Sequence, residues 1–245
     1  HTWGWKSLKI ITLGIMTLIF GGLFYFRDSK INYPLINFKM FKIKTFTFGN
    51  IAVMTSYMCM FTNGILLPLF LQEIVKYNAF LTGLLILPYS IASSAVAPFA
   101  GSYAGKNGSR GLTIAGPCIY ILALVIFTTF NPSTPMWEIV LASVIMGIGN
   151  GCFQSPSNNA IITCVNKDEL GIASGILSLS RNLGNILGVA VTITLFDSFR
   201  NLLIEEGTKY QTAFLTSYHW TMCFGIAFGL TCLICSAIAY TPEKS

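Results

Sequence analysis

Residues 217–240 read SYHWTMCFGIAFGLTCLICSAIAY, an apolar run that contains no Asp, Glu, Lys or Arg. A helix needs about 20 predominantly apolar residues to cross the roughly 30 Å hydrocarbon core of a bilayer. Six further stretches meet this requirement, at residues 8–26, 48–70, 80–104, 111–130, 137–165 and 170–196. The sequence therefore predicts an all-α protein, a polytopic bundle of seven transmembrane helices.

Composition supports the membrane class. Hydrophobic residues make up 53% of the chain and charged residues only 10%, against about 25% charged in a soluble domain. A soluble helical protein of this size would need a polar stripe on each surface helix, which these stretches lack over most of their length. The net charge of +6 does not indicate a nucleic-acid partner, because the charges fall in the connections and are not gathered on one face.

The basic residues also predict an orientation, because cytoplasmic loops are enriched in Lys and Arg. With the N-terminus outside, the inner segments hold nine of these residues and the outer segments five. The inner set is Arg27, Lys30, Lys39, Lys42, Lys44, Lys106, Arg110, Lys167 and Lys244, and the outer set is Lys6, Lys9, Lys76, Arg200 and Lys209. We therefore expect the N-terminus of this chain outside and its C-terminus in the cytoplasm.

Several familiar chemical motifs are missing from the sequence. The seven cysteines all lie in apolar stretches, and Cys232 and Cys235 form a CxxC pair without a nearby His, Asp or Glu. We interpret them as small buried hydrophobic residues and predict no metal site. The sequence contains no HExxH, GxSxG or Walker pattern. These observations argue against an enzyme and against ATP-driven transport.

The prolines inside predicted helices include Pro88 and Pro98 in residues 80–104 and Pro156 in residues 137–165. Proline removes a backbone hydrogen bond and bends a helix, which a membrane tolerates where protein or water satisfies the freed groups. Each proline marks either a fixed bend for packing or a bend point in a helix that moves.

Residues 170–196 carry the clearest polar pattern. Small and polar residues recur at spacings of three and four, which places them on one helix face: Gly171, Ser174, Ser178, Arg181, Asn185, Gly188 and Thr192. The predicted apolar side consists of Leu177, Leu179, Leu183, Ile186, Leu187 and Val191. The pairs Gly171/Gly175 and Gly184/Gly188 have GxxxG spacing, which permits close helix contact.

Arg181 is predicted to lie near the middle of the membrane, about 12 Å along the helix from Ala173. A cation at that depth costs at least about 2.5 kcal/mol and marks a functional site or an ion pair. The carboxylates Glu138 and Asp197 fall at the outer ends of their stretches, so neither is expected to pair with it. Arg181 therefore either faces a polar cavity or bonds to backbone carbonyls.

Amide side chains suggest where such a cavity would run. Gln154 and Asn158 share a helix face with Gly147 and Gly151, and Asn185 and Asn63 lie in two other predicted spans. These residues either line a polar passage that takes substrate or form hydrogen bonds between helices.

Residues 101–110, GSYAGKNGSR, resemble the G-x-x-x-D-[RK]-x-G-[RK]-[RK] loop of the major facilitator superfamily, in the weaker copy of the second half. Gly101, Lys106, Gly108 and Arg110 match this gating-loop motif. Gly105 replaces the aspartate and Ser109 replaces a basic residue, so the acidic partner for a gating salt bridge is missing.

Other stretches resemble the fourteen-helix drug:proton antiporters of that superfamily: PLFLQ at 68–72, TGLLILP at 82–88, GIGNG at 147–151, GIASG at 171–175 and RNLG at 181–184. Trp3 and Trp5, with Pro34 after the first stretch, are similar to the last linker helix of that group. The resemblance implies a linker transmembrane helix and basic cytoplasmic loop in residues 1–45 and the C-terminal six-helix bundle of the major facilitator fold in residues 46–245. An N-terminal six-helix half would complete the transporter.

The resemblance implies a multi-pass protein of the cell membrane that exports small hydrophobic or cationic drugs. The proton gradient would supply the energy, and no cofactor is expected. The expected partners are the lipid bilayer, the N-terminal half and the substrate. Two alternatives stay open: an exporter of a specific metabolite such as a sugar, amino acid or siderophore, and a nonfunctional fragment or membrane scaffold.

Overall fold

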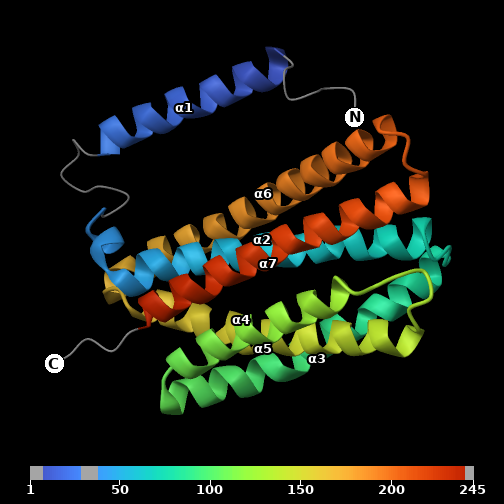
Figure 1. The fold of residues 1–245 in the computed structure, drawn as a ribbon. Helices are drawn as coiled ribbons and strands as arrows, with labels where there is room; N and C mark the ends of the chain where they lie inside the picture. Colours follow the sequence, from blue (N-terminus) through green and yellow to red (C-terminus); the bar gives the residue numbers. More distant parts are fainter. Residues whose placement is uncertain (1–7, 29–37, 241–245) are drawn as a thin grey trace. The chain divides into compact units, whose positions relative to one another are not determined.

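A computed structural model describes residues 8–28 and 38–240, and these are almost entirely helical with no strand among them (Figure 1). The elements in chain order are α1 (Leu8–Asp28), η1 (Phe38–Lys42), α2 (Lys44–Glu73), α3 (Ala79–Asn107), α4 (Arg110–Phe127), α5 (Met136–Thr163), η2 (Lys167–Glu169), α6 (Leu170–Glu205) and α7 (Tyr210–Ala239). The predicted all-α class is confirmed.

The chain divides into two compact units, His1–Met40 and Phe41–Ser245. The first unit contains α1, whose apolar stretch is Thr12–Leu23. The second is a bundle of α2 to α7, and these six helices are each long and apolar enough to cross a membrane. Several predicted features lie outside the described residues: Trp3, Trp5, Lys6, Lys30, Pro34 and Lys244.

One predicted connection is shorter in the structure than in the sequence analysis. Helix α6 runs to Glu205 and α7 begins at Tyr210, so Arg200 belongs to a helix and not to an outer loop. Apolar residues explain the difference, because Phe199 packs edge-on against Trp220 with ring centroids 5.1 Å apart. This contact continues the packing between the two helices past the predicted end of the span.

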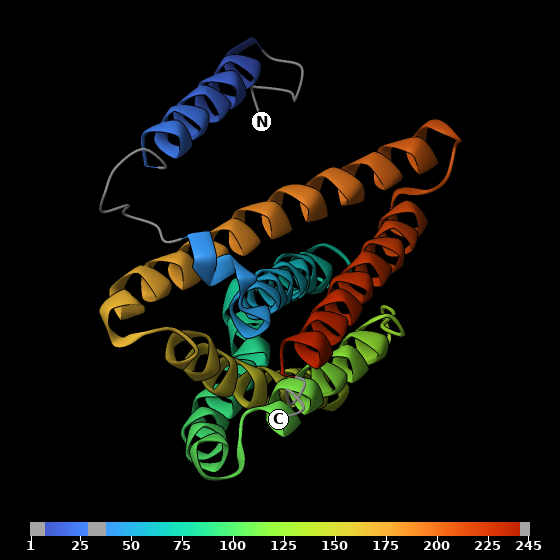
Figure 2. The ribbon, with the colours of Figure 1, turned by 90° about the vertical axis from the view of Figure 1, so that its left-hand side faces the viewer.

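The bundle is arranged as two equivalent sets of three helices (Figures 1 and 2). Helix α2 packs against α6 and α7, and α5 packs against α3 and α4. Exchanging α2 with α5, α3 with α6 and α4 with α7 reproduces the packing pairs among these six helices. The exchange relates the consecutive helices α2–α4 to α5–α7, and because α5 is the third helix after α2, these two triplets run in opposite directions. This is the inverted repeat found in many transporter folds.

Glycines allow the closest helix contacts within each set. A Cβ added at Gly188 of α6 would lie 2.8 Å from Met58 Cα of α2, and one at Gly151 of α5 would lie 2.8 Å from the Ser93 carbonyl oxygen of α3. Distances below 3 Å force a shift of the neighbouring backbone. The backbones of α2 and α6, and of α3 and α5, can approach this closely because these positions carry no side chain.

An aromatic cluster joins α2, α7 and the connection that follows α4 at one end of the bundle. Phe70 lies between Phe130 and Tyr218, with ring centroids 6.2 Å and 5.1 Å away. The side chains of these three residues are fully buried. His219 Nε2 lies 3.0 Å from the carbonyl oxygen of Phe130, which adds a polar contact to the same junction. This end of the bundle is therefore closed by packed aromatic rings.

Candidate functional site

Helix α2 provides a scale for depth in the bundle. It has 30 residues, about 45 Å of helix, and its midpoint falls between Met58 and Cys59. Two hydrogen bonds fix its register with α6: Ser180 Oγ donates to Asn50 Oδ1 at 3.0 Å, and the Thr62 and Thr192 hydroxyls lie 2.9 Å apart. Both pairs are 130 residues apart in sequence. The two helices therefore run in the same direction, and each α6 residue has a counterpart on α2.

A polar cluster lies at the midpoint of the helices, where α2, α3 and α5 meet. The Met60 sulfur accepts two long hydrogen bonds, from Tyr89 Oη at 3.8 Å and from Gln154 Nε2 at 3.9 Å. A thioether sulfur is a weak acceptor, so these contacts hold the donors loosely. All three residues are partly exposed. Their donors are consequently available for exchange to a stronger acceptor.

Two amides extend this cluster and are more firmly held. Asn63 Nδ2 donates to the Met146 sulfur at 3.2 Å, and Asn150 Nδ2 donates to Ser93 Oγ at 2.8 Å. Both asparagines are more than nine-tenths buried, and their Oδ1 atoms have no hydrogen-bond partner among the described residues. Each therefore presents an unused acceptor within the core of the bundle.

The predicted cavity-lining residues divide into two groups. Gln154 and Asn63 belong to the central cluster. Asn158, Arg181 and Asn185 lie nearer the Lys44 end of α2, and each has a buried polar atom without a described partner. Ile161 of α5 packs against Gly49, which lies near the Lys44 end of α2. Asn158 is three residues before Ile161 in the same helix, so it lies toward that end as well. The structure thus places the predicted polar residues at two depths.

Arg181 lies at the level of Ile51, about 11 Å from the α2 midpoint toward its Lys44 end. The predicted depth of Arg181 in the membrane stays a prediction, because this level is measured along α2 and not from a bilayer. Arg181 is half-buried, its Nε is enclosed, and it makes no ion pair or hydrogen bond with a described residue.

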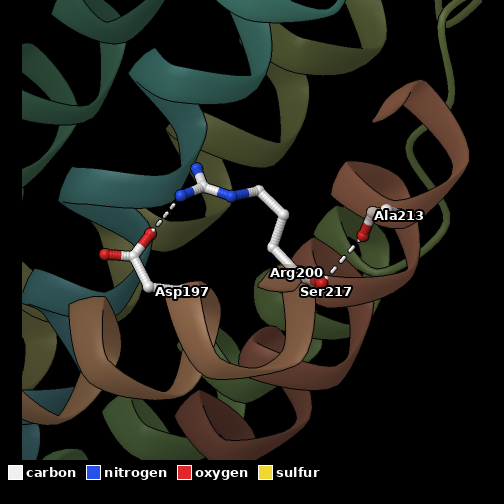
Figure 3. Close-up of polar contacts among 4 residues, drawn as sticks. All are labelled: Asp197, Arg200, Ala213 and Ser217. Carbon is white, nitrogen blue, oxygen red and sulfur yellow. Dashed lines mark hydrogen bonds and ion pairs between the residues drawn. The ribbon is translucent and has the colours of Figure 1, made fainter. Parts of the chain in front are cut away.

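Asp197 and Arg200 form an ion pair near the Glu205 end of α6. Arg200 Nη2 lies 2.8 Å from Asp197 Oδ1, and its guanidinium carbon is 5.3 Å from the centre of the Phe196 ring. Figure 3 shows the pair one turn apart on α6, beside the Ser217–Ala213 hydrogen bond of α7. The charge of Arg200 is therefore balanced within its own helix, unlike that of Arg181.

The predicted gating-loop motif spans the end of α3 and the start of α4. Gly101 and Lys106 lie in α3, Gly108 caps it with φ of +85°, and Arg110 begins α4. A Cβ at Gly101 would lie 2.6 Å from Ser155 Oγ, so this glycine brings α3 close to α5. Lys106 and Arg110 are exposed. The two glycines shape the connection while the two basic side chains remain available to a partner.

The prolines fall inside continuous helices. Pro88 and Pro98 lie in α3 and Pro156 in α5, as the sequence indicated, and Pro68 of α2 and Pro117 of α4 are also within helices. Pro88 precedes Tyr89 of the central cluster. Whether these helices bend during function stays a prediction.

The predicted apolar side of α6 does not face one environment. Leu177, which belongs to that side, is 1% exposed and packs inside the bundle, whereas Leu179 and Ile186 are exposed. Leu177 shares the buried face with Ala173, Gly184 and Gly188, while Ser174 and Ser178 are exposed. The helix is therefore buried through an apolar and glycine-rich face, and its small polar residues border that face on the exposed side.

The sequence analysis missed several members of the central cluster. Tyr89, Ser93 and Asn150 were not among the predicted site residues. Asn150 lies one helical turn before Gln154, a spacing of four that was visible in the sequence. Tyr89 and Ser93 are also four residues apart on α3. A search of the positions one turn from each predicted amide would have found Asn150. Its hydrogen bond to Ser93 of α3 could be found only from the structure.

A sequence profile of the Major Facilitator Superfamily matches residues 1–189 and 49–245, in two overlapping segments. Together the segments cover the chain from end to end.

Individual relatives are similar over about half of their length. The riboflavin transporter RibZ of Clostridioides difficile is 29% identical over 84% of this chain and 44% of its own length. The lincomycin resistance protein LmrB of Listeria monocytogenes is 28% identical over 95% of this chain and 50% of its own length. The multidrug resistance protein Stp of Mycobacterium tuberculosis is 25% identical over 82% of this chain and 37% of its own length. The chain thus spans half or less of these curated relatives.

Proposed function

This chain belongs to the major facilitator superfamily, and on that basis we propose that it is the C-terminal half of a proton-coupled multidrug efflux transporter of the fourteen-helix antiporter type. Membership establishes a multi-pass membrane protein of a transporter family, in which members are not enzymes. The direction of transport, the coupling ion and the substrate are parts of the proposal.

The central cluster is the observation that carries it. Substrate sites in these folds lie near the bilayer midplane, between two repeats. Met60, Tyr89 and Gln154 meet near the midpoint of α2, which we take as the midplane, and their weak sulfur contacts leave two donors for a ligand. A methionine and a tyrosine beside one amide suit hydrophobic compounds of varied shape, because the thioether adapts its conformation to the ligand.

The exposed faces of α3 and α6 support a missing partner half. The exposed residues of α3 include Ser90, Ser94 and Ser102, and those of α6 include Ser174 and Ser178. Small polar residues on a membrane helix favour contact with another helix over contact with lipid. We propose that an N-terminal six-helix half covers these faces, that residues 46–245 form the matching bundle, and that residues 1–45 supply the linker helix and a cytoplasmic loop.

Proton coupling and any binding of cations would depend on that other half. Within the described bundle, Glu73, Glu138 and Glu205 lie at helix ends, and Asp197 is paired with Arg200. None of these carboxylates lies at the level of the central cluster. In this proposal the partner half contributes the proton-accepting group and the carboxylate for a cationic drug, and the central cluster of this chain contributes hydrogen bonds and apolar contacts.

Drug uptake into everted membrane vesicles that contain the full-length protein tests the proposal. We expect uptake of a hydrophobic drug to stop when a protonophore dissipates the proton gradient. Gln154→Leu should lower uptake about two- to tenfold, the range for the loss of one neutral hydrogen bond. The matched control is Gln72→Leu, at an exposed position near the end of α2. Uptake that is insensitive to the protonophore would contradict the coupling.

The alternative of a specific metabolite exporter is favoured by one relative, which is named as a riboflavin transporter. Competition separates the two proposals. If riboflavin alone among structurally varied compounds inhibits uptake, the protein exports a metabolite. If unrelated hydrophobic drugs compete with one another, it is a multidrug exporter.

A further inference from the structure

We infer that Arg181, with Asn185 and Ser178 beside it, recognises an anionic group, a carboxylate or phosphate, on the compound that the transporter moves. This inference rests on the proposed function and deepens it by naming a chemical feature of the substrate. It concerns a second position in the bundle, nearer the Lys44 end of α2 than the central cluster.

The charge of Arg181 is not balanced within the described bundle. Other cations of the bundle have a different setting. Lys44, Lys106 and Arg110 lie at the ends of helices, and Arg200 forms an ion pair. Arg181 is eleven residues beyond the first residue of α6 and has no described partner. A guanidinium in a membrane helix is costly unless it faces a polar cavity or a partner, and it marks a functional position by default.

The surroundings of Arg181 suit a ligand with several acceptor atoms. Ser178 and Asn182 are exposed on either side of it in sequence, and Asn185 follows one turn later. The nearest acidic residues of the same helix segment are Glu169 and Asp197, twelve and sixteen residues away. A guanidinium binds a carboxylate or phosphate through two parallel hydrogen bonds, and neighbouring hydroxyl and amide groups can donate further ones.

The position of Arg181 is also fixed before a ligand arrives. The adjacent Ser180 donates to Asn50 of α2, and Gly184 packs against Met54 and Tyr57 of the same helix. These contacts set the rotation of α6 and therefore the side on which Arg181 emerges. A preordered cation loses less conformational entropy on binding than a mobile one.

Two sources of the anionic group share this chemistry: the transported compound and the phosphate of a membrane lipid. Arg181 lies within reach of a headgroup if its side chain extends toward the membrane surface. The exposed Ser174, Ser178 and Asn182 on the same stretch of α6 favour the transported compound, because such residues are poorly suited to contact with lipid tails.

Two dyes with the same ring system but opposite charge provide the test. Full-length protein in proteoliposomes is assayed with fluorescein, which is anionic, and with rhodamine 123, which is cationic. We expect Arg181→Gln to lower the ratio of fluorescein to rhodamine 123 transport at least about tenfold, the loss expected for a charged hydrogen bond. Arg181→Lys should restore part of that ratio, because it keeps the charge but not the paired geometry.

Lys167→Gln is the matched control. It removes one positive charge from an exposed position in η2 and should leave the ratio unchanged. An equal loss of both dyes in Arg181→Gln would overturn the inference, because it would show a structural role. Transport of rhodamine 123 but not of fluorescein by the wild-type protein would also overturn the inference. Transport of neither dye in response to a proton gradient would instead contradict the proposed function.

Binding measurements keep the inference testable if fluorescein is bound but not transported. Fluorescence anisotropy reports fluorescein affinity of the purified full-length protein in nanodiscs of phosphatidylcholine alone, or with phosphatidylglycerol added. We expect wild-type affinity to exceed that of Arg181→Gln at least about tenfold in both lipids. Wild-type affinity that falls to that of Arg181→Gln when phosphatidylglycerol is present would assign Arg181 to anionic lipid headgroups and overturn the inference.

Discussion

Gly108 is the residue on which the connection between α3 and α4 depends. Its φ of +85° and ψ of 154° lie in a region that only glycine adopts without strain. This conformation turns the chain within two residues, so that Arg110 already belongs to the next helix. The motif glycine is therefore explained by backbone geometry, independently of any role in gating.

Replacing Gly108 with alanine should lower the free energy of unfolding by about 1–3 kcal/mol, because the added Cβ strains the backbone. Gly105→Ala is the matched control. Gly105 is helical and a Cβ there meets nothing within 4 Å among the described residues. The midpoint of thermal unfolding of the purified full-length protein measures both. Equal midpoints for the two variants would show that the connection tolerates a side chain.

Arg181 and Arg200 show how two arginines of one helix differ in function. Arg200 bonds to Asp197 and lies over Phe196, so its charge and its planar face are both satisfied locally. Arg181 has an enclosed Nε and no described partner. Both residues are arginines, and they differ only in the groups that surround them. For this reason we propose a binding role for Arg181 and not for Arg200, whose ion pair holds it within α6.

At the scale of elements, α6 combines two different faces. Its buried face follows Ala173, Leu177, Gly184, Gly188 and Thr192. Helix α2 lies against it so closely that side chains are excluded at the two glycines. The exposed face carries the small polar residues that we propose meet the partner half. Helix α6 is thus positioned by α2 and presents its polar side away from it.

Gly184→Ala should separate α2 from α6 and lower the free energy of unfolding by about 1–3 kcal/mol, the usual cost of overpacking. An added Cβ there would lie 2.9 Å from Tyr57 Cβ and closer still to the Met54 carbonyl oxygen. The control, Gly111→Ala, lies in the first turn of α4 with nothing within 4 Å. Denaturant unfolding of the full-length protein compares them. A Gly184→Ala protein as stable as the control would mean that the two helices separate at no cost.

Hydropathy was enough to predict the helices but not their ends or their pairing. The lengths of the apolar runs identified the six spans of the bundle, because the bilayer imposes one length on all of them. The end of α6 was missed because contacts such as Phe199–Trp220 extend the helix beyond the apolar run. Met60, Tyr89 and Gln154 come from three helices, and no spacing within one helix predicts that they meet. The burial of Leu177 likewise depends on which side α2 occupies.

At the largest scale, the inverted arrangement of the six-helix bundle explains where its exposed surface lies. The same exchange that relates α2 to α5 also relates α3 to α6. The two helices with the least buried spans are α3 and α6, so the exposed surface of the bundle is distributed symmetrically between the sets. A single partner of matching symmetry can cover both.

The orientation of the whole bundle is a prediction that one labelling experiment can check. The excess of basic residues places the connection between α3 and α4 in the cytoplasm and the turn between α4 and α5 outside. We therefore expect a membrane-impermeant maleimide to label Ser133→Cys in intact cells, and Ser109→Cys only after the membrane is opened. Ser133 is exposed, and Ser109 precedes α4 without a side-chain capping bond.

The native cysteines determine the background of that experiment. Cys118 and Cys223 are exposed in the structure but lie within α4 and α7, so lipid should shield them from a water-soluble reagent. The unsubstituted protein measures any residual labelling, and subtracting it gives the signal of each introduced cysteine. Labelling of Ser109→Cys, and not of Ser133→Cys, in intact cells would invert the topology. It would then place Arg181, which lies near the Lys44 end of α2, toward the outer leaflet, where it would meet the compound on its way out and not on entry.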